Sequence, residues 1–180
     1  MSPRIEPAQP PFHEKVQALL EERTGGRPPL VLFTMLARDP RLFERFLSGS
    51  LMDRGNLSLR NRELVVARAT ALSKCEYEWG IHAAIFWEKA GFTEEQILST
   101  AKGGPADACW SPEEHALLTA VDQLNATCDL DDAAWDALKA HFSEEAIIEV
   151  LMLAGKYRMI AYLTNALRMP MEKFARRFPA

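Results

Sequence analysis

The sequence predicts an all-α fold, and three observations support this prediction. Apolar residues recur with the 3.6-residue period of a helix between breaks that are rich in Gly and Pro. At two places Ser or Thr stands three residues before Glu or Gln, the capping-box pattern that begins a helix. No segment combines sustained alternation of polar and apolar residues with β-branched enrichment, so we expect no strand.

The expected helices follow from these breaks and start signals. Thr93 and Ser111 are N-caps of capping boxes, and Pro112 fits the first helical position because that residue needs no N–H partner. Ser143 precedes the longest helix and Pro170 stops it. We expect helices over residues 12–23, 30–37, 41–48, 59–73, 75–90, 94–101, 112–126, 132–140, 144–168 and 171–177.

The chain is long enough for one sizeable core. It has 180 residues, of which 48% are hydrophobic. We expect an N-terminal extension with one helix over residues 1–29 and a single helical domain over residues 30–180. The stretch 91–97 recurs weakly at 141–147, which suggests two helical halves built alike.

Charge and composition argue against several functions. A net charge of −4 and a pI near 5.6 disfavour nucleic acid as a partner, and the clustered basic pair Arg176-Arg177 is interpreted as a solvated end. The N-terminus has no apolar signal region, and the most apolar stretch, 146–167, carries charges that a membrane span tolerates poorly. Three cysteines without framework spacing favour a reducing compartment. We therefore expect a cytoplasmic protein without a membrane or nucleic-acid partner.

The most informative segment is residues 75–82, which contains Cys75, Glu78 and His82. Offsets of 0, 3 and 7 place these three side chains on one face of a helix. Twelve residues before the cysteine, Glu63 lies in another helical run and could complete the group from a neighbouring helix. A thiol, two carboxylates and an imidazole would then share one space.

Each of these residues also has a purely structural interpretation. A single buried thiol such as Cys75 is more often packing than chemistry, and Glu78 and His82 could form a solvated pair on a helix surface. If they are buried they need partners, and paired, pKa-perturbed groups gather at functional sites. A metal site on Cys75, Glu78 and His82 is the weaker idea, because no fourth ligand is spaced nearby. We expect no metal and no cofactor.

The same residues resemble a known family. Arg62-Glu63-Leu64, then Cys75, Tyr77, Glu78, Trp79 and His82, then Gly91 to Ile97, resemble the carboxymuconolactone decarboxylase family, which includes the alkylhydroperoxidase AhpD. The later blocks 113–124 and 155–159 are similar to the C-terminal half of longer members. The resemblance implies an all-helical AhpD-like fold that assembles as a homo-oligomer and acts on a small-molecule substrate.

The two branches of the family imply different chemistry. The AhpD branch uses two cysteines three residues apart, and here the second position is Glu78, so a sulfenate at Cys75 lacks a local resolving thiol. The decarboxylase branch resembles the Glu78 and His82 arrangement, which could deliver a proton to carbon. This implies His82 as general acid, Glu78 as the group that orients it, and Glu63 as a relay. Trp79 is interpreted as packing, although it could form the wall of a pocket.

Three functions remain open at this point. The first is a decarboxylase-type lyase that uses acid–base chemistry on a small carboxylated or lactone substrate. The second is a thiol peroxidase acting through Cys75, with Cys109 or Cys128 as a distant resolving thiol. The third is an oligomeric binding module without turnover, because a fold does not determine a function.

Overall fold

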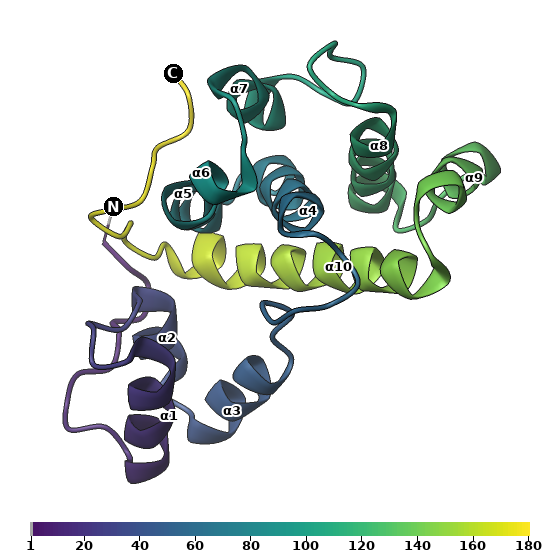
Figure 1. The fold of residues 1–180 in the computed structure, drawn as a ribbon. Coiled ribbons are helices and arrows are strands. Elements are labelled where there is room, and N and C mark those ends of the chain that lie inside the picture. Colours follow the sequence, from purple (N-terminus) through teal and green to yellow (C-terminus); the bar gives the residue numbers. More distant parts are fainter. Residues whose placement is uncertain (1) are drawn as a thin grey trace.

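All regular secondary structure in the described part of the chain is helical. The computed structural model describes residues 2–180, and within that range it contains ten helices and no strand (Figure 1). The helices are α1 Glu14–Thr24, α2 Val31–Leu36, α3 Pro40–Ser48, α4 Leu59–Leu72, α5 Glu76–Ile85, α6 Trp87–Ala90, α7 Glu94–Lys102, α8 Pro112–Thr127, α9 Asp132–His141 and α10 Glu144–Leu167. The all-α prediction is confirmed.

Helix α4 lies at the centre of the main core. It packs against α8, α10, α5 and α7, and eight consecutive residues from Glu63 to Thr70 are buried. A helix that is covered on all sides must bury its polar side chains as well, and each of those then needs a partner. Arg68 shows this, because it donates to both oxygens of Asp122 on α8 and to the carbonyls of Thr100 and Gly103.

Helices α1 to α3 form a second, smaller hydrophobic cluster. Its buried members are Val16, Leu20, Ala37, Phe43 and Leu47. In Figure 1 the long helix α10 runs across the molecule, with α4 to α9 on one side and α1 to α3 on the other. Side chains of α2 and α3 also pack against the main core, so the space between the two clusters is bordered by both.

The predicted start signals are present. Thr93 and Ser111 each form a complete capping box, and Ser58, Asp131 and Ser143 accept backbone hydrogen bonds as N-caps. The helix predicted over 75–90 is instead two helices. Phe86 separates α5 from α6 with φ near −116° and ψ near −28°, and the capping N–H of Phe86 still bonds the carbonyl of His82.

The helix predicted over residues 171–177 is wrong. The segment after α10 forms no helix and, beyond Arg168, only one turn, at residues 173–174, because Arg168 adopts the left-handed conformation and Pro170 cannot continue a helix. Its backbone bonds α5 instead, since the N–H of Arg176 donates to the carbonyl of Gly80. A Cβ at Gly80 would collide with the carbonyl oxygen of Arg176, so glycine is required for this approach.

The basic end of the chain is also held in place. Arg176 pairs with Glu94 and Arg177 pairs with Glu76, and both arginines are exposed, as expected of a solvated end. Glu172 accepts hydrogen bonds from the N–H of Val31 and the hydroxyl of Tyr77, each at 2.6 Å. The C-terminal segment therefore connects α5 to the start of α2.

Candidate active site

The site begins with a buried carboxylate on α4. Glu63 is fully buried, with 0% of its surface exposed. Arg62, the preceding residue on the same helix, places Nη2 3.1 Å and Nε 3.2 Å from Oε1 of Glu63. Oε2 remains available and lies 2.7 Å from Nδ1 of His82 on α5. Glu63 thus links a cation on α4 to the imidazole on α5.

His82 has a partner at each ring nitrogen. Nε2 lies 2.8 Å from the hydroxyl of Tyr157 on α10, and the two rings meet edge to face with centroids 5.0 Å apart. The network is complete when Nδ1–H donates to Glu63 and Nε2 accepts from the Tyr157 hydroxyl. Burial raises the pKa of Tyr157 well above its usual value, so that hydroxyl keeps its proton.

Glu78 lies one turn before His82 on α5. Its Oε2 is 3.7 Å from Nε2 of His82, which is longer than a hydrogen bond, and only 5% of the residue is exposed. No hydrogen bond from any group of residues 2–180 reaches its carboxyl. Burial is the main cause that raises the pKa of Glu78, against the opposing charges of His82 and Lys156. A buried carboxyl without a partner favours its neutral, proton-donating form.

A cavity of about 300 Å³ opens beside these residues. Glu78, His82 and Tyr157 line it, together with Lys156 and, from α1, Arg23. Its wall is mostly apolar and includes Leu32, Phe33, Phe46, Met52, Ile85 and Phe86. The cavity lies between α5 and α10 on one side and α1 to α3 on the other, and its volume suits a small ligand.

Cys75 does not line this cavity. It is the N-cap residue of α5 and is completely buried, and its Sγ lies 3.1 Å from the hydroxyl of Thr164 on α10. A helix N-terminus usually lowers a thiol pKa, but burial is the larger effect here and raises the pKa of Cys75. The thiol therefore has the surroundings of a packed side chain.

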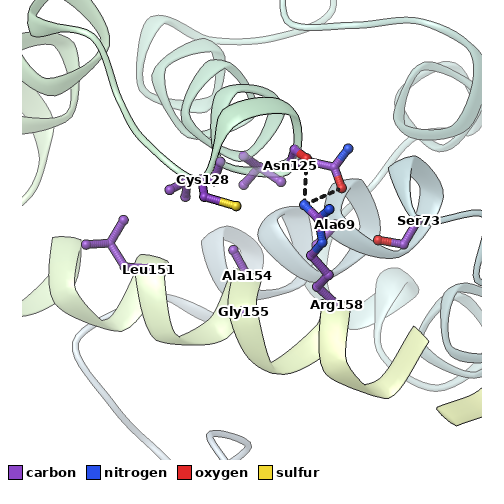
Figure 2. A pocket seen from close by; sticks show the side chains of 10 residues that line it. Ala69, Ser73, Asn125, Cys128, Leu151, Ala154, Gly155 and Arg158 are labelled. Atoms are coloured by element: carbon purple, nitrogen blue, oxygen red, sulfur yellow. Dashed lines mark hydrogen bonds between the residues drawn. The ribbon is translucent and has the colours of Figure 1, made fainter. Parts of the chain in front are cut away.

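The other two cysteines belong to different parts of the structure. All three thiols are free, with Cys109 half-buried and Cys128 exposed at the end of α8. Figure 2 shows Cys128 at a second cavity, of about 190 Å³, between α4, α8 and α10. There Arg158 donates to the carbonyl and the side-chain oxygen of Asn125. None of the predicted site residues lines this second cavity.

The remaining candidates are structural. Trp79 packs edge to face against Trp87 with centroids 4.8 Å apart, and its indole N–H donates to Thr100, so it is not a wall of the site cavity. The other histidines, predicted to be surface groups, are exposed: His13, His115 and His141. Within residues 2–180, no three His, Cys, Asp or Glu side chains are grouped to hold a metal ion. No helix of that range could cross a membrane.

Sequence reasoning missed three residues of the site. Tyr157 and Lys156 come from α10, and Arg62 supports Glu63 from the same helix. The only signal for the first two was the block 155–159, which the resemblance singled out without giving those residues a role. The hydroxyl of Tyr157 reaches His82 across 75 residues of sequence, a separation that no local pattern reveals.

The ten described helices form an all-helical protein with an AhpD-like fold. Residues 40–123 match the model of the Carboxymuconolactone decarboxylase family, a segment that contains Glu63, Cys75, Glu78 and His82. This segment is therefore similar to the family that the resemblance named. No curated protein matches the chain.

Solved structures with the same fold cover nearly the whole chain. A peroxidase-related protein from Silicibacter sp. TM1040 has a TM-score of 0.76 at 17% identity, with 99% of each chain covered. An AhpD-core, peroxidase-related protein from Ralstonia eutropha JMP134 has a TM-score of 0.73 at 19% identity, covering 90% of this chain and 87% of that one. The debrominase Bmp8, in complex with 2,3,4-tribromopyrrole, has a TM-score of 0.70 at 18% identity, covering 96% and 94%. At these identities the likeness shows the fold alone.

Proposed function

We propose that this protein is an acid–base enzyme, a decarboxylase-type lyase that acts on a small carboxylated or lactone substrate held in the 300 Å³ cavity. The observation that carries the proposal is the carboxyl of Glu78. It is almost fully buried, lines the cavity, and has no hydrogen-bond partner in residues 2–180. A protein places such a group at a cost in free energy, and the cost is offset when the group donates a proton to a ligand.

In this proposal Glu78, rather than His82, donates the proton to the substrate. The carbon–carbon bond to the departing carboxylate breaks, carbon dioxide leaves, and the electron pair left on the substrate takes the proton of Glu78. His82 relays the next proton: Nε2, 3.7 Å from the carboxyl of Glu78, takes up a proton from solvent in place of the hydrogen bond from Tyr157 and passes it to Glu78 after a small approach. Glu63 holds the imidazole in position for this step.

Tyr157 has a supporting role in the same reaction. Tyr157 lines the cavity and its hydroxyl keeps its proton, so once Nε2 of His82 carries a proton of its own the hydroxyl can turn its hydrogen to a substrate oxygen that gains negative charge as the bond breaks. The mostly apolar wall offers few competing partners, which strengthens this hydrogen bond relative to its value in solution.

The thiol peroxidase alternative has less support. A peroxide would have to reach Cys75, yet this thiol is fully buried, is paired with Thr164 and is absent from the cavity lining. Its raised pKa also lowers the fraction of thiolate, the species that attacks a peroxide. No observation favours this function, or a binding module without turnover, over the acid–base enzyme.

The test compares two variants on one substrate panel. Release of carbon dioxide is measured from small unsaturated lactone acids, and reduction of cumene hydroperoxide is measured with a dithiol reductant. We expect Glu78→Gln to lose about 10²- to 10⁴-fold in decarboxylation rate, the usual worth of a positioned proton donor, and Cys75→Ser to keep most of it. Peroxide reduction that disappears in Cys75→Ser but survives in Glu78→Gln would overturn the proposal.

A further inference from the structure

Lys156 places a cation inside the cavity that the catalytic groups share. It precedes Tyr157 on α10, is half-buried, and lines the cavity with Glu78 and His82. Its Nζ donates to the carbonyl of Phe46 at 2.9 Å and lies 4.0 Å from the centre of the Phe46 ring. An ammonium group has three donors, so this contact leaves two of them without an acceptor among residues 2–180.

No carboxylate of residues 2–180 forms an ion pair with Lys156. Glu78 acts on Lys156 through its charge, but the two side chains form no ion pair, and burial raises the pKa of Glu78. Burial lowers the pKa of Lys156, which shows that the ammonium is poorly solvated where it lies. An anionic ligand in the cavity would supply the missing counter-charge.

The rest of the cavity suits an apolar body rather than a second charge. Phe33, Phe46, Ile85 and Phe86 line it, and these side chains offer no hydrogen-bond donors. Arg23 also borders the cavity, but it is exposed at the end of α1, where water and salt screen its charge. A second carboxylate on the ligand would lose its hydration against this wall and gain no partner.

We propose that Lys156 is the anion anchor of the site and that the substrate is a small monoanion with a largely apolar body, whose single carboxylate, the group that leaves as carbon dioxide, contacts Nζ while the body lies against Phe33, Phe46 and Ile85. This inference rests on the proposed function, because both place the substrate in the same cavity. It narrows the substrate class, because it disfavours polar dicarboxylates. It also explains why an uncompensated lysine lies beside a proton donor.

The test measures binding by titration calorimetry with the full chain and three probes. These are 3-phenylpropanoate as the apolar monoanion, 3-phenylpropanamide as its neutral counterpart, and cis,cis-muconate as a dianion with little apolar surface. We expect wild-type protein to bind the monoanion about tenfold or more tightly than either other probe, the size of effect typical of a charge-assisted hydrogen bond. Equal affinity for acid and amide, or no binding of any probe, would overturn the proposal.

Variants of Lys156 test whether this residue causes the preference for the acid over the amide. Lys156→Gln can still donate to the Phe46 carbonyl but carries no charge, so we expect the acid-to-amide preference to fall to about one. Lys156→Arg should restore it. Lys139→Met, on an exposed lysine of α9, is the matched control and should keep the wild-type ratio. If Lys156→Gln kept the wild-type acid-to-amide ratio, the anion would be bound by another group.

Glu78→Gln separates this inference from the proposed function. It should bind 3-phenylpropanoate with a preference like that of wild type, while its turnover on the lactone acids is lost. If Glu78→Gln kept both its turnover and the acid preference, the proposed function would be wrong and the role of Lys156 as anion anchor would remain supported. If Glu78→Gln lost its turnover while Lys156→Gln kept the acid preference, the role of Lys156 would be wrong and the proposed function would remain supported.

Discussion

Oε2 of Glu63 lies 2.7 Å from Nδ1 of His82, and this contact joins α4 to α5 at the cavity. Glu63 is fully buried and His82 is 4% exposed, so water and salt screen the contact little. It fixes the ring so that Nε2 faces Tyr157 and Glu78. The orientation of the imidazole is therefore set by a residue 19 positions away, and Glu78, its neighbour on the same helix, is left to face the cavity.

Replacing His82 tests whether this orientation serves catalysis. We expect His82→Gln to lower turnover on the active lactone acid by about 10²- to 10⁴-fold, because glutamine donates a hydrogen bond to Glu63 but does not titrate near neutral pH. The measurement is kcat with circular dichroism as a check on folding. His115→Gln, on the exposed face of α8, should leave kcat unchanged. Full activity in His82→Gln, or loss of its fold, would show that the histidine is structural.

The sequence was sufficient for the helices and for much of the site because both depend on local patterns. Capping residues such as Ser111 act within one turn, and the offset of four between Glu78 and His82 follows from helix geometry. Glu63 could be proposed as a neighbour because it lies in a second helical run twelve residues before Cys75, and the resemblance implied its role as a relay. The helix predicted after α10 was wrong because the backbone of that segment hydrogen-bonds to α5, and this tertiary contact outweighs the local helix preference.

Partners distant in sequence could not be predicted. The thiol of Cys75 hydrogen-bonds to Thr164, 89 residues away in sequence, so no local pattern predicts the burial that makes this thiol unreactive. The cavity could not be predicted for the same reason, because it forms where residues of α1 to α3 face residues of α5 and α10, which are distant in sequence. A helical period indicates that a face is buried, but it does not identify what covers that face.

The three thiols should react with Ellman's reagent in order of their exposure. We expect Cys128 to react first, and Cys75 only after unfolding in urea, because it is fully buried with a raised pKa and the thiolate is the reactive form. Cys128→Ser should remove the fast phase, and Cys75→Ser only the slowest. A native Cys75 that reacts as fast as Cys128 would restore the peroxidase alternative.

The stability of the protein should depend on pH through Glu78. Its folded pKa is raised above the ordinary value of 4.5, so its contribution to stability is fully present below that value and is lost as pH rises through the folded pKa. Glu78→Gln removes this group, so the variant should gain on wild type by about 1.4 kcal/mol per pH unit inside that window and level off above it. Urea unfolding across a pH series measures the difference.

Glu22→Gln provides the control for this titration. Glu22 is an exposed carboxyl on α1, so its replacement reports what losing a surface charge does to the unfolding curves. The difference between Glu78→Gln and wild type should grow with pH and exceed that of Glu22→Gln. A difference that shrinks as pH rises would mean that Glu78 is stabilised as the carboxylate, and the proton-donor role would then fail.

The last prediction is that copies of this chain associate through α10. Five large apolar side chains on this helix are exposed by 36% to 62%, at spacings of three, four and seven residues that place them along one face: Ile148, Leu151, Met152, Met159 and Tyr162. Gly155 lies among them, and a Cβ there would meet nothing within 4 Å, so a second helix could approach closely. A contiguous apolar face of this kind is typical of an interface, and the same face of a second copy, related by a two-fold axis, would cover it.

We expect light scattering after size exclusion to give at least twice the 20.3 kDa of one chain, and the double variant Ile148→Glu with Met152→Glu to give a monomer. Leu98→Glu, on an exposed residue of α7, should keep the wild-type mass. A wild-type monomer at micromolar concentration, or a double variant with unchanged mass, would show that this face is not where copies meet.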